Sequence, residues 1–198
     1  LKADNKKALI AYLMAGDPGL AETEQLVLAL EQAGADIIEL GVPFSDPIAD
    51  GPTLQQAAER ALAAGTSTAD VIAVAAAVRA RTQVPIALMG YLNPILAHGI
   101  LRFARDCGRA GVDAVIVPDL LPEEAGEIAP VLLSHGVRTV FLLAPTSGEG
   151  RVEAAAPAAT GFLYFVSVTG VTGARATLPA DLDAKVRAVR AASRVPVV

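Results

Sequence analysis

Two carboxylates stand at the end of one apolar segment and in the loop that follows it. Glu39 belongs to the β-branched segment 36–40, and Asp50 comes eleven residues later, just before Gly51 and Pro52. A carboxylate in a buried strand is costly unless it is paired or used in chemistry. Two carboxylates in different environments suit general acid and base catalysis. For Glu39 considered alone, bonding to loop amides or to an arginine explains the residue equally well.

The loop that joins these carboxylates is long but restrained. Gly41 and Gly51 permit backbone turns, and three prolines within residues 41–52 stiffen the chain around them. Glu39 and Asp50 are therefore expected to converge, one from a strand and the other from a loop.

Other reactive groups are sparse, and this limits the chemistry. His98 and His135 fall near predicted helix ends with no partner at metal-ligand spacing, which excludes a zinc-dependent aldolase. Cys107 lies in an amphipathic segment and is expected to pack in the core. The lysines all lie outside the predicted strands and their ends, which excludes a Schiff-base aldolase; they are Lys2, Lys6, Lys7 and Lys185. Carbon–carbon cleavage would then need an electron sink within the substrate.

Composition excludes several classes of protein. A chain of 198 residues that is 53% hydrophobic can form one large core, and we expect a single domain. The net charge of −5 and the scattered basic residues argue against a nucleic-acid partner or a membrane surface. No apolar run approaches the roughly 20 residues that a membrane span needs. The charged first residues do not form a signal peptide, and the single cysteine fits a reducing compartment, so a cytoplasmic protein is expected.

Apolar strands alternate with helical patterns along the chain. Gly111, Gly136 and Gly161 each precede a predicted strand and are 25 residues apart. Such a βα repeat predicts a parallel sheet covered by helices, either a barrel or a doubly wound sheet. The segment 16–19 after the first strand lacks the glycine pattern of a nucleotide-binding fold. The predicted strands are 9–14, 36–40, 85–89, 114–117, 138–143, 162–166 and a seventh opening at 195–198. The predicted helices are 20–33, 53–63, 68–81, 93–108, 122–134, 148–156 and 181–192.

Several motifs together resemble the signature of the tryptophan synthase alpha subunit. They are ELGVPFSDP at 39–47, ADGP at 49–52, GDP at 16–18, GYLNP at 90–94 and GVTG at 170–173. The resemblance covers essentially the whole chain and implies a TIM (β/α)8 barrel. It also implies a lyase that cleaves indole-3-glycerol phosphate to indole and glyceraldehyde 3-phosphate. An indole ring protonated at C3 is an electron sink within the substrate, so this chemistry agrees with the exclusion of lysine and metal.

The resemblance assigns roles to particular residues. Glu39 would protonate indole C3 and take the proton of the glycerol hydroxyl, while Asp50 would stabilise positive charge at the indole nitrogen. Tyr164 would hold Glu39 or the substrate tail. In the late glycine motif, Gly173 would touch the phosphate and Thr172 would bond Asp50 as the loop closes. Without the resemblance, this motif could equally be an ordinary turn.

The same resemblance implies an indole pocket lined by Tyr12, Met89 and Ile116, although core packing is the alternative for each. Gly90 stands where many family members carry a bulkier residue, which could enlarge this pocket. Leu121 replaces a proline that often follows Asp119, which could weaken the surface presented to a partner.

The implied partner is the tryptophan synthase beta subunit, in an α2β2 heterotetramer. Pro43, Asp46 and the 119–122 loop would contact it, and pyridoxal phosphate would be bound only there, so this chain is expected to need no cofactor and no metal. Two alternatives remain: a phosphosugar isomerase on the same fold, and a subunit that only activates its partner.

The printed sequence stops at Val198, at the start of the predicted seventh strand, whereas a TIM barrel has eight. We therefore expect residues 1–198 to form one barrel domain of about six βα units without the C-terminal part of the barrel. If the protein itself ended there, the alternative to the lyase would be an inactive chain or a subunit that only activates its partner.

Overall fold

The computed structural model describes residues 7–167 and 179–198. Its six strands form one parallel sheet in sequence order. The strands are β1 (Ile10–Met14), β2 (Ile37–Gly41), β3 (Ile86–Met89), β4 (Ala114–Ile116), β5 (Arg138–Leu143) and β6 (Leu163–Phe165). The helices are α1 (Leu20–Gln32), α2 (Pro52–Ala63), α3 (Thr68–Arg79), α4 (Leu92–His98), α5 (Ile100–Ala110), α6 (Ala129–Ser134), α7 (Glu149–Ala158) and α8 (Leu182–Ala192), with a 3-10 helix η1 (Pro122–Glu127).

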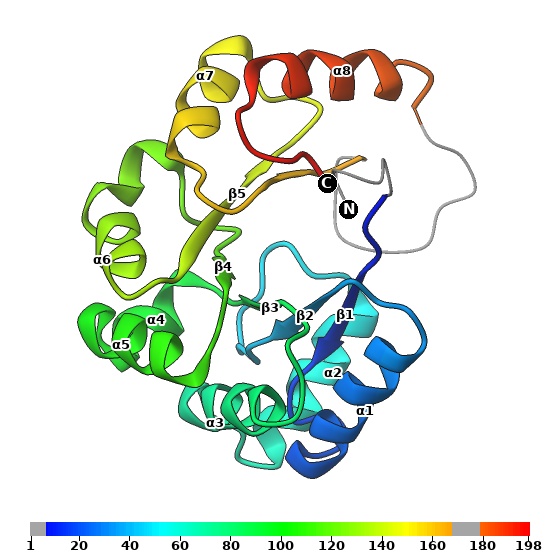
Figure 1. The fold of residues 1–198 in the computed structure, drawn as a ribbon, viewed down its shortest axis with the longest axis vertical. Helices are drawn as coiled ribbons and strands as arrows, with labels where there is room; N and C mark the ends of the chain where they lie inside the picture. The colour runs from blue at the N-terminus through cyan, green and yellow to red at the C-terminus, as the bar shows by residue number, and fades with distance from the viewer. Residues whose placement is uncertain (1–6, 168–178) are drawn as a thin grey trace.

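The strands curve around the middle of the molecule and the helices surround them (Figure 1). A parallel bridge joins Leu163 to Val197, so the chain end opens a further strand beside β6, as the sequence predicted. A parallel sheet with helices on the outside is the arrangement of a (β/α) barrel, and this confirms the predicted fold class.

The two faces of the sheet have different neighbours. Ile38 and Leu40 in β2 are fully buried in the main core, which the strands share with the surrounding helices. A second cluster lies on the opposite face and includes Met89, Ile116 and Tyr164. Because side chains alternate along a strand, the two faces collect different residues, and the second face is the barrel interior.

Local signals in the sequence explain where several helices begin. Ser67 caps α3, its side chain accepts a hydrogen bond from the backbone N–H of Asp70, and the Asp70 carboxylate accepts one from the backbone N–H of Ser67. Pro52 occupies the first turn of α2, where its missing N–H costs nothing. Gly111 ends α5 with a φ of 75°, a conformation that favours glycine.

Two predicted helices were wrong in their boundaries. The single helix expected over 93–108 is broken into α4 and α5 at Gly99, whose φ of 90° is incompatible with a continuous α-helix. The helix expected over 122–134 is a 3-10 helix followed by α6, and the two meet at Ile128. In both places the apolar pattern continues across the break, so periodicity alone did not reveal it.

Cys107 and His98, which were expected to have structural roles, both pack inside the protein. Cys107 is fully buried, and burial raises the pKa of its thiol to about 12. His98 Nε2 lies 3.0 Å from Asp106 Oδ2, and its ring packs edge-on against Phe103. Within the described ranges, no group of three or more His, Cys, Asp or Glu side chains is arranged to hold a metal ion.

Across the described ranges, none of the helices alone has the length and apolar character needed to cross a membrane. In the part of the chain that the structure describes, α2 and α3 taken together are the one pair that passes that test by length and composition, and they are bent by 97° relative to each other.

Candidate active site

Glu39 faces the barrel interior from β2. It pairs in register with Tyr12 of β1 and Ala87 of β3, and it is only 6% exposed. Burial, and then the negative charge of Asp50, raise the pKa of Glu39 to about 7. A carboxyl group with a pKa near neutrality can both donate and accept a proton at physiological pH, as a general acid–base catalyst must.

Asp50 ends the β2–α2 loop and is 3% exposed. Its backbone carbonyl accepts a hydrogen bond of 2.9 Å from the Gln55 side chain, which ties the loop to the first turn of α2. Burial raises the pKa of the Asp50 carboxyl, and the nearby Tyr91 hydroxyl opposes that rise. The Oδ1 atom finds no hydrogen-bond partner among the described residues. A buried acceptor of this kind is costly, so it fits a donor supplied by a ligand.

Two tyrosines lie close enough to these carboxylates to feel their charge. Burial and then Glu39 raise the pKa of the Tyr164 phenol in β6. Burial, Asp50 and Glu39 raise the pKa of Tyr12 in β1. The structure therefore brings together Glu39, Asp50, Tyr12 and Tyr164, which were predicted from distant segments of the sequence.

Met89 and Ile116 stand opposite each other in the β3–β4 register and belong to the interior cluster. Ile116 is 1% exposed, whereas Met89 is half-buried. Met89 can therefore meet a ligand directly, while Ile116 in this structure supports the wall from within the packing. Thr172 and Gly173, predicted to contact Asp50 and the phosphate, lie outside the described residues.

The predicted partner residues differ in exposure. Asp46 is exposed, but Pro43 is buried within this chain, so Pro43 can influence a partner only through the loop that it shapes. Ile48, in the same loop, is 74% exposed and was not singled out from the sequence. Asp119 accepts a 2.9 Å hydrogen bond from the Leu92 N–H, so this carboxylate caps the start of α4.

The sequence did not reveal the role of Tyr91, which precedes α4. This residue is 2% exposed, and its hydroxyl accepts a 3.0 Å hydrogen bond from the backbone N–H of Ala49. Its ring packs against Phe44 with centroids 5.4 Å apart. A tyrosine directly after a predicted strand was the available signal, but nothing in the sequence paired it with the neighbouring loop.

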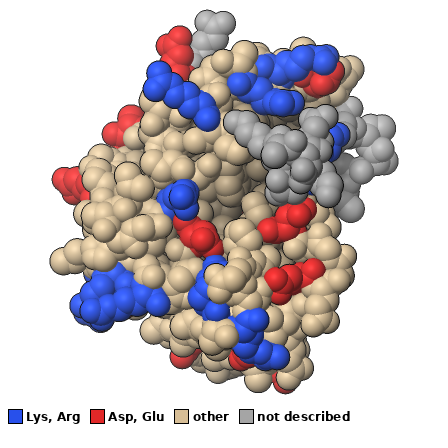
Figure 2. All heavy atoms as spheres, in the orientation of Figure 1, with Lys and Arg blue, Asp and Glu red and all other residues tan. Residues whose placement is uncertain are grey.

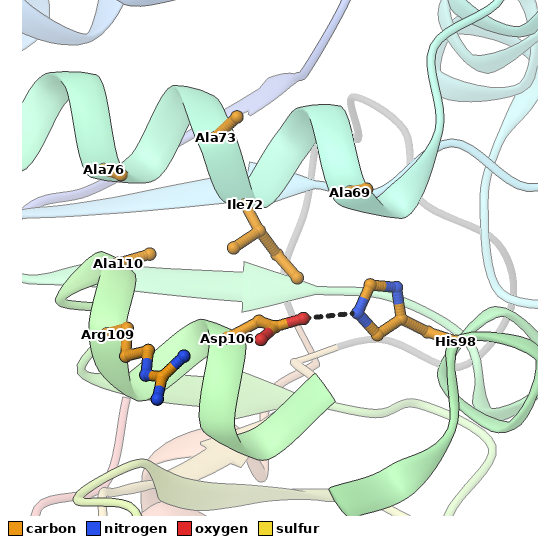
Figure 3. A pocket seen from close by; sticks show the side chains of 8 residues that line it. All are labelled: Ala69, Ile72, Ala73, Ala76, His98, Asp106, Arg109 and Ala110. Carbon is orange, nitrogen blue, oxygen red and sulfur yellow. Dashed lines mark hydrogen bonds and ion pairs between the residues drawn. The ribbon is translucent and has the colours of Figure 1, made fainter. Parts of the chain in front are cut away.

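The face of the molecule turned to the viewer is hollowed near its middle, with acidic groups beside the hollow and basic groups dispersed around it (Figure 2). A different cavity of about 310 Å³ lies between α3 and α5 in the outer helical layer (Figure 3). Alanine side chains form much of its wall, and the paired His98 and Asp106 stand at one end. The carboxylate pair does not line this outer cavity, so we do not assign the chemistry to it.

The fold and the site define a (β/α) barrel protein with two buried carboxyl groups, Glu39 and Asp50, at and after the end of β2. A sequence model of the family "Tryptophan synthase alpha chain" matches residues 1–198, and this chain belongs to that family.

Its relatives agree with this assignment. The tryptophan synthase alpha chain of Geobacter sulfurreducens is 56% identical over 198 residues, which are 100% of this chain and 75% of that protein. A structure of Mycobacterium tuberculosis tryptophan synthase superposes with a TM-score of 0.91 at 40% identity, covering 99% of this chain and 75% of that one. The structure of the tryptophan synthase α2β2 complex from Pyrococcus furiosus gives a TM-score of 0.89 at 39% identity, covering 96% and 76% of the two chains.

Proposed function

We propose that this chain is a lyase of tryptophan biosynthesis that cleaves indole-3-glycerol phosphate to indole and glyceraldehyde 3-phosphate. The observation that carries the proposal is the buried Glu39 carboxyl, whose pKa is raised to about 7 beside a second buried carboxyl, that of Asp50. Membership of the tryptophan synthase alpha chain family supports the choice of substrate.

In the proposed reaction, the protonated Glu39 carboxyl gives its proton to indole C3. This converts the ring into a cation that can accept the electrons of the breaking carbon–carbon bond. The Glu39 carboxylate then takes the proton of the adjacent glycerol hydroxyl as that carbon becomes the aldehyde carbon of glyceraldehyde 3-phosphate. The proton count balances and Glu39 is regenerated, which requires a pKa close to the working pH.

Asp50 is proposed to stabilise the cationic intermediate. The positive charge is shared with the indole nitrogen, whose N–H would donate to the buried and otherwise unpartnered Oδ1. In a site of low dielectric, a fixed carboxylate stabilises developing positive charge more strongly than water does. Two carboxylates would thus have separate tasks, one moving protons and the other remaining charged.

Tyr12 and Met89 are proposed to line the indole pocket, with Ile116 behind them. The Tyr164 phenol, whose pKa is raised by burial and by Glu39, stays neutral and can donate a hydrogen bond to Glu39 or to the substrate. Thr172 and Gly173 remain proposed contacts of Asp50 and the phosphate. Residues 1–198 are proposed to form a single barrel domain.

We further propose that the chain works in the cytoplasm as the alpha subunit of an α2β2 complex with a beta subunit. The Pyrococcus furiosus α2β2 complex, to which this chain is similar, supports this partner. Exposed Asp46 and Ile48 on the β2–α2 loop offer a surface close to the carboxylates. Pyridoxal phosphate would be held by the beta subunit alone, and none of the steps proposed for this chain requires it.

The experiment is to incubate the purified chain with indole-3-glycerol phosphate, alone and with a matching beta subunit from a family member, and to quantify both products. Indole and glyceraldehyde 3-phosphate should form in equal amounts, with Glu39→Gln as the inactive control. Release of neither product under both conditions would refute the proposed activity, and a phosphosugar isomer formed instead would favour the isomerase alternative.

A further inference from the structure

Tyr91 connects two loops that the sequence separates by about forty residues. It precedes α4 at the end of the β3 segment, and its ring packs against Phe44 of the β2–α2 loop with an interplanar angle of 35°. The side chain is almost completely buried. A ring held in this way has little freedom, so its hydroxyl is directed at one place in the structure.

That place is the end of the loop that carries Asp50. The Tyr91 hydroxyl accepts a hydrogen bond from the Ala49 N–H at 3.0 Å, which leaves its own proton free to be donated. Asp50 directly follows Ala49, and the Tyr91 hydroxyl beside it opposes the effect of burial on the pKa of the Asp50 carboxyl. Burial raises the pKa of Tyr91 to about 12, so the phenol keeps its proton at physiological pH.

We propose that Tyr91 is a positioning residue that fixes the Asp50 carboxylate for the indole nitrogen. Its hydroxyl anchors the backbone N–H of Ala49, the residue directly before Asp50, and thereby fixes the part of the loop from which the carboxylate projects. Asp50 Oδ1 has no hydrogen-bond partner among the described residues and stays available to the substrate. This inference rests on the proposed function, because the orientation matters only if Asp50 stabilises charge on the bound ring.

The charged surroundings of Asp50 make the Tyr91 hydroxyl important. The titratable groups that interact with Asp50 are Glu39 from β2, Tyr12 from β1 and Tyr91 itself, and Asp119 interacts with Tyr91. No lysine or arginine contributes to the pKa of Asp50 in the part of the chain that the structure describes. The Tyr91 hydroxyl is therefore the group that favours the ionised form of Asp50 against burial.

Tyr91→Phe tests the inference because it removes the hydroxyl and keeps the ring. In the full chain, kcat/KM for indole release should fall by roughly ten- to a hundredfold, a loss typical of a misplaced catalytic group. The acidic limb of its pH profile should also move to higher pH, because the Asp50 carboxyl loses a neighbouring hydroxyl that favours its charged form. A purely structural role would lower activity at every pH alike.

Phe44→Leu is the matched control, because it loosens the contact with the Tyr91 ring and keeps the Tyr91 hydroxyl. The acidic limb of the pH profile of this variant should lie at the same pH as in the parent. Carbon-13 NMR of aspartate-labelled protein, with Asp50→Asn for assignment, reads the Asp50 titration without any substrate, and thermal melting checks that each variant folds.

The inference would be overturned if folded Tyr91→Phe kept the parent's pKa for Asp50 or the parent's acidic limb in the pH profile. It would also be overturned if Phe44→Leu displaced the acidic limb as much as Tyr91→Phe does. A parent chain that releases no indole would overturn the proposed function instead, and the NMR titration would still report on Tyr91.

Discussion

Gly41 lies so close to Tyr12 that a Cβ atom on Gly41 would come within 2.2 Å of the Tyr12 hydroxyl oxygen. The sequence suggested that Gly41 serves a turn, but it is the last residue of β2 and has no positive φ. Glycine is needed there for space. The absence of a side chain lets the Tyr12 ring lie across the end of β2, beside Glu39 in the register.

Gly41→Ala should therefore displace Tyr12 and distort the proposed indole pocket. We expect KM for indole-3-glycerol phosphate to rise by about tenfold or more, equivalent to at least about 1.4 kcal/mol of binding. Steady-state kinetics checks this. Gly126→Ala is the control, because a Cβ atom there would meet nothing within 4 Å, and it should leave KM unchanged. If Gly41→Ala had the same KM as the parent, the assignment of Tyr12 to the indole pocket would be wrong.

Glu39 should destabilise the folded protein at neutral and alkaline pH. Its pKa is raised from 4.5 to about 7, so the folded state binds this proton more tightly than the unfolded state does. Stability contributed by Glu39 is then present below about pH 4.5, falls as the pH rises towards 7, and stays low above it.

Glu39→Gln should consequently increase the free energy of unfolding at pH 8 by about 2–4 kcal/mol and change it little at pH 4. Urea unfolding at the two pH values measures the difference. Glu59→Gln, at an exposed position on α2, should show no such pH-dependent gain. Equal effects of Glu39→Gln at both pH values would contradict the raised pKa.

Arg79 ties together the loops that lead into β3 and β4. Its guanidinium donates to the carbonyls of Val84 and Gly111 at 2.9 Å each and pairs with Asp113 at 2.6 Å. Arg79→Met should lower the free energy of unfolding by about 2–4 kcal/mol, because several acceptors lose their donor together.

Arg81→Met is the matched control for that loss. Arg81 pairs with Glu24 but is itself 57% exposed, so its removal should cost under about 1 kcal/mol. Chemical denaturation of the two variants under identical conditions makes the comparison. Equal losses would mean that the Arg79 cluster is no stronger than a surface ion pair.

Ile48 should be covered by the partner. It is 74% exposed in the same loop as Asp46 and only two residues before Asp50. Ile48→Asp should weaken binding to a beta subunit by at least about tenfold, since an apolar contact at the interface would be replaced by a buried charge.

Isothermal titration calorimetry measures that affinity. Leu26→Asp changes an apolar residue of α1 that is 42% exposed, and it should bind as the parent does. If both variants bound equally well, the β2–α2 loop would not be the contact surface.

The sequence predicted the strands well because each is a short apolar run bounded by glycine or proline, as in the segments around Glu39 and Tyr164. It failed where a break lies inside a continuous apolar pattern, as at Gly99 and Ile128. The carboxylate pair was predictable because both residues flank one distinctive loop. The role of Tyr91 was not, because it depends on a hydrogen bond across two loops, which no local pattern encodes.

The role of Glu39 as the proton carrier is tested most directly by the rate of indole release. This rate is measured for Glu39→Gln and for the parent chain under the same conditions, with saturating indole-3-glycerol phosphate. Binding of a non-cleavable analogue without the glycerol hydroxyls serves as the check that the site is intact. The rate should fall by more than the roughly 10²–10⁴-fold that one proton transfer contributes, because a single residue serves two steps, while the analogue binds nearly as before. A rate within tenfold of the parent, with the analogue still bound, would contradict the assignment of Glu39.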